Sequence, residues 1–180
     1  MKIGIAGAGG IGSNVAMLLA RSGIHALRLV DFDRVEAVNL DRQFYFADQV
    51  GELKVEMLAA NLRRIRPGIA IETIPARLDA GNCAAIFADC RLVVEGLDLA
   101  GEKKMLLEAL ADGRRTIVSA CGIAGADLSG IRVRRVGNCH IVGDFCSDCS
   151  RQPLHAHKVL AVACRMTEII LDIGGTHARP

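Results

Sequence analysis

The sequence is poor in aromatic residues and nearly balanced in charge. Its 180 residues include no tryptophan, one tyrosine and five phenylalanines, so it offers no row of aromatic side chains on which nucleic-acid bases could stack. The formal net charge is only +2 at pH 7, and bulk electrostatics therefore give no reason to expect a polyanionic partner. The sequence predicts no nucleic-acid partner.

Long apolar runs and a secretion signal are also missing. No stretch is long and apolar enough to cross a bilayer, and a glycine-rich turn interrupts the apolar start of the chain before it could serve as a signal peptide. We therefore expect a cytoplasmic protein with no membrane partner, in a reducing compartment that argues against structural disulfides among its seven cysteines. Four of the cysteines lie singly among apolar residues, which is typical of small core residues: Cys83, Cys90, Cys121 and Cys164.

Short β-rich runs alternate with segments of helical periodicity along the chain. With 51% hydrophobic and 23% charged residues, it suits a single domain over residues 1–180. Strands are expected near residues 2–6, 26–31, 69–74, 91–95 and 115–119, and helices near 12–22, 48–65, 80–88, 99–112 and 155–173. This order predicts an α/β, Rossmann-like fold with a largely parallel sheet and helices on both faces. Alternating apolar and basic residues over 131–136, followed by a run at 139–142, predict a short antiparallel addition.

A glycine-rich turn links the first expected strand to the first expected helix. Such a turn lets the backbone approach a phosphate, and the helix N-terminus points free N–H groups at it. About 20 residues later Asp31 ends the second strand, where a carboxylate reaches the ribose of a bound nucleotide. Asp33 follows at the same edge and has a weaker claim, because its direction depends on where the strand ends. The predicted cofactor-binding glycines are Gly7, Gly9, Gly10 and Gly12.

A polar cluster follows that an ordinary dehydrogenase does not need. Asn39, Arg42, Gln43 and Lys54 lie within 16 consecutive positions, 39–54. Cations and fixed donors of this kind stabilise the negative charge that grows when a triphosphate is cleaved. Asp98 follows the apolar run 92–94 and precedes a helix, so we expect it at the sheet edge that also holds the glycine turn.

These segments together resemble the ThiF/MoeB/HesA superfamily, the bacterial relatives of ubiquitin-activating enzymes. Within this superfamily, the short chain is most similar to the compact ThiF-like family 2 proteins, which are linked to thiamine biosynthesis. The resemblance implies an ATP-dependent adenylyltransferase that activates the C-terminal Gly-Gly carboxylate of a small ubiquitin-like sulfur carrier, ThiS-like, for thiamine thiazole or a related sulfur cofactor. It also implies a homodimer, whose contact we expect to include part of 131–145. The segments that carry the resemblance are 7–13, 30–33, 39–43, 50–54, 95–98 and 141–144.

The resemblance also assigns roles to single residues. Arg42 and Lys54 match residues that contact the phosphates, and Asn39 and Gln43 match residues that shape the same pocket. Asp98 matches an aspartate that supports Mg²⁺ and the reacting phosphate, which suits a hard cation. We therefore predict Arg42, Lys54 and Asp98 as the catalytic residues.

The chain departs from its larger relatives at three points. They usually have asparagine where this chain has Leu99, and arginine where it has Lys103, which keeps the charge without the bidentate fork. They also carry an N-terminal helical segment that sends an arginine to the partner's triphosphate, and no residue here matches it. Two alternatives stay open. The glycine turn and Asp31 also suit an NAD-dependent oxidoreductase, and the missing arginine makes a non-catalytic nucleotide-binding module possible.

One CxxC pair, Cys146 and Cys149, leaves a further question open. With His155 and His157 it could form a structural zinc site, although two histidines one residue apart are awkward ligands on a helix. The pair could instead be redox-active or handle sulfur, or consist of exposed loop cysteines.

Overall fold

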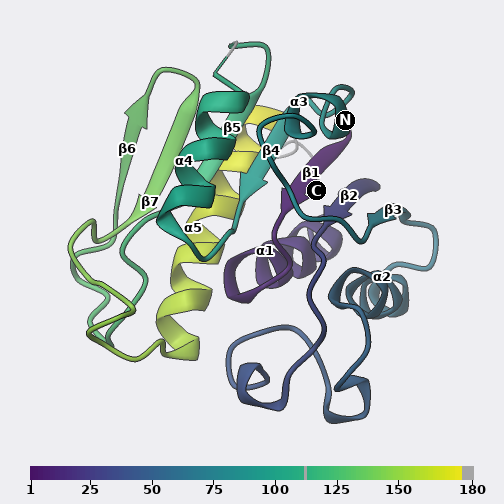
Figure 1. The fold of residues 1–180 in the computed structure, drawn as a ribbon, viewed down its shortest axis with the longest axis horizontal. Coiled ribbons are helices and arrows are strands. Elements are labelled where there is room, and N and C mark those ends of the chain that lie inside the picture. The colour runs from purple at the N-terminus through teal and green to yellow at the C-terminus, as the bar shows by residue number, and fades with distance from the viewer. Residues whose placement is uncertain (112, 176–180) are drawn as a thin grey trace.

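A seven-stranded sheet forms the centre of the computed structural model, which describes residues 1–111 and 113–175. The strands follow the order β3-β2-β1-β4-β5-β7-β6 across the sheet (Figure 1). Neighbouring strands are parallel apart from β6, which runs antiparallel to β7. The strands are β1 Ile3–Ala6, β2 Ala26–Val30, β3 Ala70–Ile74, β4 Leu92–Glu95, β5 Thr116–Ala120, β6 Arg132–Val136 and β7 Cys139–Gly143.

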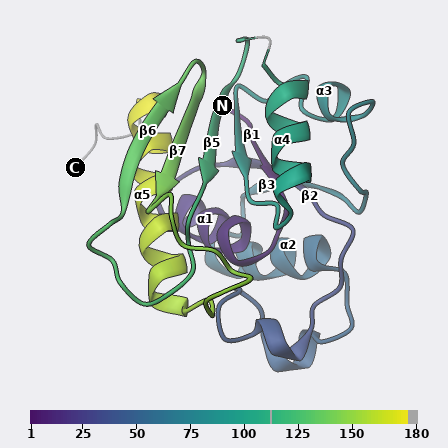
Figure 2. The same cartoon turned by 60° about the vertical axis from the view of Figure 1, so that its left-hand side comes forward.

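Helices cover both faces of this sheet (Figure 2). Buried residues of α1, α2 and α5 pack on one face, and those of α3 and α4 pack on the other. Strands β1 and β4 lie between the two layers and are buried along their whole length, which explains why their residues are apolar up to Glu95 at the end of β4. The helices are α1 Gly10–Arg21, α2 Lys54–Ile65, α3 Cys83–Ile86, α4 Ala100–Ala109 and α5 Ala156–Gly174.

The predicted fold class is confirmed, including the short antiparallel addition. The predicted helix over 48–65 is wrong in its first third, because α2 begins only at Lys54. A short 3₁₀ turn, Ala47–Gln49, and Gly51 with φ of +93° precede it, and a left-handed residue cannot continue an α-helix. The helix predicted over 80–88 is reduced to α3, and residue 112, the last of the predicted 99–112, lies outside the described residues.

The four cysteines predicted in the core divide into two pairs. Cys83 and Cys90 are buried, as predicted, whereas Cys121 and Cys164 are exposed. Cys164 lies on the solvent side of α5 and Cys121 directly follows β5, so an apolar neighbourhood in sequence did not mean burial there. None of the described helices combines the length and the apolar composition needed to cross a bilayer.

Candidate active site

Two adjoining cavities open at the carboxyl ends of the parallel strands. Asp31, Asp33 and Lys54 line the first cavity, of about 270 Å³. Arg42 and Gln43 line the second, of about 450 Å³. The segment 96–98, just after β4, borders both. A parallel sheet binds ligands at this edge because its loops and helix N-termini converge there.

The glycine turn at the floor of the cavities has no room for side chains at two of its positions. Gly7 has a φ of +87°, which L-residues with side chains rarely adopt. A Cβ on Gly12 would lie 1.8 Å from the carbonyl oxygen of Gly7. The turn is held from both sides, because Ala8 N donates to Asp31 Oδ2 at 2.6 Å and Tyr45 Oη donates to the Ala8 oxygen at 2.7 Å. The backbone is therefore pre-organised to face a ligand.

Asp31 is a largely enclosed carboxylate that braces this turn. Its second oxygen accepts a hydrogen bond from Asp33 N at 2.8 Å. Burial raises the pKa of Asp31, and the hydrogen bonds from Asp33 and Ala8 oppose that rise. Lys54 is 4% exposed, and its Nζ lies 3.1 Å from Asp33 Oδ2, so the buried ammonium is held by an ion pair beside the cavity.

The mouth of the first cavity is formed by side chains that sequence reasoning missed. The Arg77 guanidinium lies 5.6 Å from the ring centroid of Phe32 and forms a 2.8 Å ion pair with Glu102. All three residues line the cavity. An exposed aromatic residue directly after the second strand was the only signal in the sequence.

The cation of the second cavity is oriented by its neighbours. Arg42 donates to Asn39 Oδ1 and to Asp41 Oδ1, both at 2.8 Å. Asn14 on α1 donates to the Arg42 carbonyl oxygen at 2.9 Å, which ties this loop to the glycine turn. Asn39 borders neither cavity, so within the described residues its contribution is to hold Arg42.

Asp98 and Gln43 lie close to Gly9. A Cβ on Gly9 would be 3.9 Å from Asp98 Oδ1 and 3.9 Å from Gln43 Nε2. Gln43 Oε1 is buried and has no hydrogen-bond partner among the described residues. An unpartnered buried acceptor indicates a place where a ligand or its water would donate.

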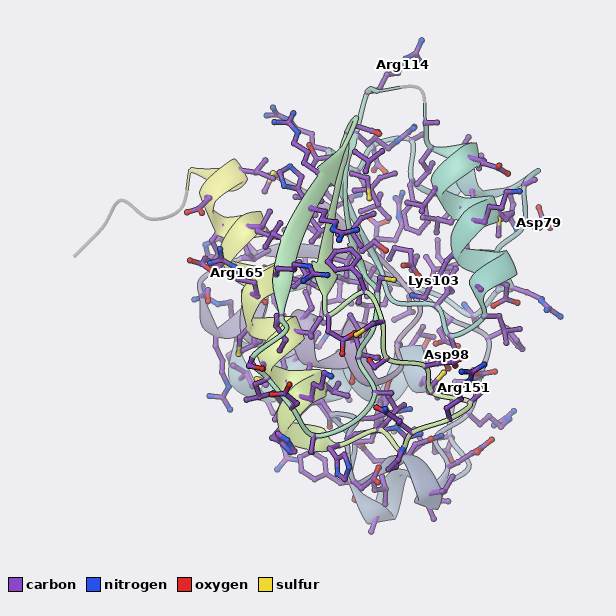
Figure 3. All side chains as sticks on the ribbon, turned by 90° about the vertical axis from the view of Figure 1, so that its left-hand side faces the viewer. Asp79, Asp98, Lys103, Arg114, Arg151 and Arg165 are labelled. Atoms are coloured by element: carbon purple, nitrogen blue, oxygen red, sulfur yellow. The ribbon has the colours of Figure 1, made fainter. Side chains whose placement is uncertain are left out.

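A buried carboxylate, Glu95, lies beneath Asp98 at the end of β4. It accepts hydrogen bonds from Lys103 Nζ at 2.9 and 3.0 Å and from Ser119 Oγ at 2.6 Å. Lys103 borders the second cavity, but its charge is matched by Glu95. Figure 3 shows Lys103 and Asp98 on the same side of the molecule. Sequence reasoning missed Glu95, although a charged residue that ends an apolar strand was the signal.

The far wall of the second cavity depends on a second buried ion pair. Lys158 Nζ lies 2.6 Å from Asp144 Oδ2 and donates to the Ala124 carbonyl oxygen at 2.6 Å. Asp144 Oδ1 accepts from Cys146 N and Ser147 N, and Ser147 Oγ accepts from Ala124 N. The pair therefore joins the loops after β5 and β7 to α5. Sequence reasoning gave Asp144 no role and missed Lys158.

The predicted residues gather at one edge of the sheet but not in one group. Asp31, Asp33 and Lys54 belong to the first cavity, Arg42 and Gln43 to the second, and Asp98 to both. Gly7 and Gly9 border the first cavity and Gly10 the second, while Gly12 is packed under the turn. Their functional roles remain predictions.

The residues considered for a zinc site are not gathered into one cluster in the described part of the chain. Within residues 1–111 and 113–175, no three His, Cys, Asp or Glu side chains lie close enough together to hold a metal ion. His157 Nε2 instead lies 2.9 Å from the Ala126 carbonyl oxygen. Cys146 and Cys149 are exposed, and Cys121 and Cys149 border the second cavity.

Comparison with known proteins identifies relatives of this chain. The adenylyltransferase and sulfurtransferase UBA4 of Candida glabrata is 31% identical over 141 residues, which are 77% of this chain and 33% of the relative. The molybdopterin-synthase adenylyltransferase of Escherichia coli is 36% identical over 123 residues, 68% of this chain and 49% of the relative. The chain thus spans a third to a half of the length of these curated relatives.

Solved structures show the same fold. The Escherichia coli tRNA N6-threonylcarbamoyladenosine dehydratase, TcdA, in complex with ATP, superposes with a TM-score of 0.83 at 19% identity, over 98% of this chain and 88% of that one. Its complex with AMP gives 0.85 at 20% identity, over 97% and 87%. The model of the ThiF family matches residues 1–170. This chain belongs to the ThiF family.

Proposed function

We propose that this chain is an ATP-dependent adenylyltransferase that activates the C-terminal carboxylate of a small ubiquitin-like sulfur carrier ending in Gly-Gly. The observation that carries the proposal is the meeting of two different cavities at Asp98. One has a glycine turn, a carboxylate and a buried lysine, and the other has walls of small residues. Two relatives named as adenylyltransferases, from Candida glabrata and Escherichia coli, support the reaction class.

The first cavity suits ATP. Its glycine turn leaves the backbone bare where phosphates would lie, since a Cβ on Gly12 has no room. Asp31 is placed for the ribose hydroxyls, and Lys54 supplies a buried positive charge near the phosphates. Phe32 and Arg77 offer an aromatic ring and a guanidinium plane against which the adenine base would stack.

The second cavity suits an extended peptide tail. Side chains of one carbon or none form much of its wall: Gly96, Ala100, Ala120, Gly122 and Ala124. Such a wall leaves room for the main chain of a peptide tail to lie close to it. A tail in this cavity would bring its terminal carboxylate to Asp98, where the two cavities join.

The proposed chemistry is an in-line displacement at the α-phosphorus. A carboxylate oxygen of the carrier forms a bond to the α-phosphorus, the bond to the bridging oxygen breaks, and pyrophosphate leaves with the electron pair. Arg42 and Lys54 approach from opposite cavities, so they would stabilise charge on different oxygens of the transition state. Asp98 is the carboxylate that would hold a Mg²⁺ ion here, and such an ion would supply positive charge to neutralise the phosphates.

Pyrophosphate exchange tests the proposal. The purified chain should move labelled pyrophosphate into ATP in the presence of a ThiS-type carrier, and a carrier that lacks its last glycine is the matched control. No exchange with any Gly-Gly carrier would reject the proposal. ATP binding without exchange would favour the nucleotide-binding module, and tighter binding of NAD than of ATP would favour the oxidoreductase.

The carrier and the pathway are separable parts of the proposal. We propose a ThiS-like carrier for thiamine thiazole or related sulfur-cofactor synthesis. Exchange with a different Gly-Gly carrier only would keep the adenylyltransferase and reject the thiamine pathway.

We also propose that the chain pairs as a homodimer through part of 131–145. This segment contains β6, an edge strand whose outer backbone groups have no neighbouring strand in the sheet. Sedimentation that shows only monomer at micromolar concentration would reject the dimer.

A further inference from the structure

We propose a second ligand site, for a phosphate group, at the amino-terminal edge of the sheet. A cavity of about 240 Å³ lies there, lined among others by Arg91, Arg135 and His140. Arg114 borders the same cavity, and Figure 3 shows it at the top of the molecule, well apart from Asp98. The site is therefore separate from the two cavities at the carboxyl edge, and the inference does not depend on the proposed adenylation.

The cavity lies where β4 and β5 begin and where β6 pairs with β7. Arg91 directly precedes β4, and Thr116 is the first residue of β5. Arg135 on β6 lies directly opposite His140 on β7 in the antiparallel register. The side chains thus come from separate elements that the fold brings together.

The described side chains that line this cavity bring positive charge from several elements. None of the described residues that line it is acidic. Within residues 1–111 and 113–175, neither Arg91 nor Arg135 forms an ion pair. Other basic side chains of the sheet have acidic partners. Lys2, which directly precedes β1, and Arg28 in β2 each form ion pairs with both Glu72 and Asp89.

The cross-strand pair offers a reporter for an anion at this place. Burial lowers the pKa of His140, and the nearby charge of Arg135 lowers it further. The imidazole is therefore favoured in its neutral form beside the Arg135 guanidinium. An anion between the two side chains would pair with Arg135 and would favour the protonated form of His140, so the His140 ring would respond to binding.

A phosphate group suits the arginine side chains of this cavity that are not used to hold its wall together. The Arg115 guanidinium donates to the carbonyl oxygens of Phe87 and Ala84, and the Asn138 amide donates to those of Leu110 and Arg115. These contacts form the wall of the cavity. Arg91 and Arg135 carry planar guanidinium groups of the kind that bind phosphate oxygens bidentately. Arg135 Nε also donates to the Gly137 carbonyl oxygen at 3.3 Å, which leaves its two terminal nitrogens for a ligand.

The test follows the His140 ring signals by NMR while inorganic phosphate is added at constant ionic strength. His140→Gln assigns the signals. We expect a saturable shift with phosphate and none with chloride. Arg135→Gln should weaken phosphate binding about 10-fold or more, because a charge-assisted hydrogen bond is lost.

Arg134→Gln is the matched control. It removes the same charge from the neighbouring position of β6, where the side chain lies over the Phe145 ring instead of in the cavity. We expect its phosphate affinity to equal that of the wild type, with sedimentation unchanged in both variants. No saturable shift, an equal shift with chloride, or equal weakening by Arg134→Gln would overturn the site.

A second titration, with AMP in place of inorganic phosphate, identifies the source of the phosphate group. AMP that shifts His140 with the same dependence on Arg135 would support a nucleotide as the natural source. A response to inorganic phosphate with no response to AMP would support a free phosphate ion.

Discussion

The two cavities that meet at Asp98 are held in place by different means. The first is framed by backbone geometry, with a left-handed Gly7, a Gly12 that admits no side chain, and hydrogen bonds to both sides of Ala8. The far wall of the second is framed by side chains, above all the buried pair of Asp144 and Lys158. The first cavity therefore depends on the backbone path of one turn, and the second on side-chain contacts that join the loops after β5 and β7 to α5.

The two cavities therefore differ in how much sequence variation their walls can tolerate. A glycine turn with no space for a Cβ restricts the chain to one backbone path, which suits a ligand part that stays the same, such as a triphosphate. Loops that are anchored by an ion pair can accept amino-acid substitutions elsewhere along their length, because the pair keeps the loops in position. We infer that specificity for the second substrate lies in 121–125 and 144–149, which carry this wall.

The largest effect is expected from a substitution that weakens the wall of the second cavity. Lys158→Met removes one partner of a buried ion pair and should lower the free energy of unfolding by about 3–5 kcal/mol, because Asp144 is left without its cation. Urea unfolding measures this change. A double variant, Asp144→Asn with Lys158→Met, should recover part of the loss, and equal loss in both would contradict the account.

The same pair gives a pH dependence of known sign. Burial opposes the ionisation of Asp144, but hydrogen bonds from Lys158, Ser147 and Cys146 outweigh it, and the pKa of Asp144 lies well below its ordinary value. The stability that this carboxylate contributes is present above the ordinary aspartate pKa and is lost as the pH falls below it. Asp144→Asn should flatten the loss of stability with acid in that range.

The next effect acts where the two cavities join. Asp98→Ala should reduce pyrophosphate exchange by at least about 10²–10³, the scale for losing one preorganised charge-stabilising group. ATP binding should persist, because the glycine turn and Asp31 remain. Replacing Arg42 or Lys54 by Met should cost a similar factor, with strongly non-additive combinations. Unchanged exchange in Asp98→Ala would sink the mechanism.

A smaller effect is expected within the first cavity. Asp31→Asn should weaken ATP binding by about 1–3 kcal/mol, since a charged hydrogen-bond partner is lost. The amide can still accept from Ala8 N, so the shape of the turn is retained better than with alanine. Calorimetry measures the affinity, and equal affinity in the two proteins would remove Asp31 from the ribose site.

The smallest expected effect concerns the thiols. Replacing Cys146 and Cys149 by serine should leave exchange unchanged, because the carrier's own carboxylate is the nucleophile in acyl-adenylate formation. The two cysteines are exposed, so we expect no cost in stability. Exchange lost in a folded double variant would show that a thiol takes part in this step.

Part of the first cavity could be predicted from the sequence, whereas its mouth, formed by Phe32, Arg77 and Glu102, could not. The glycine turn, Asp31 at the end of its strand, and Lys54 are placed by local rules, in which turn chemistry and strand ends determine position. The prediction of a long helix over 48–65 failed for a local reason too, because Gly51 adopts a left-handed conformation that the apolar periodicity does not reveal.

The second cavity was decided by tertiary structure. The fold brings Asp144, Lys158 and the carbonyl of Ala124 together from three separate segments, and it sets Cys121 in a cavity wall where its neighbours in sequence suggested a core. Hydrophobic periodicity and turn residues act over a few positions, so the sequence by itself determined the alternation of strands and helices and the phosphate-type turn. Which distant side chains face one another depends on how the packed layers align, and only the folded chain decides that alignment.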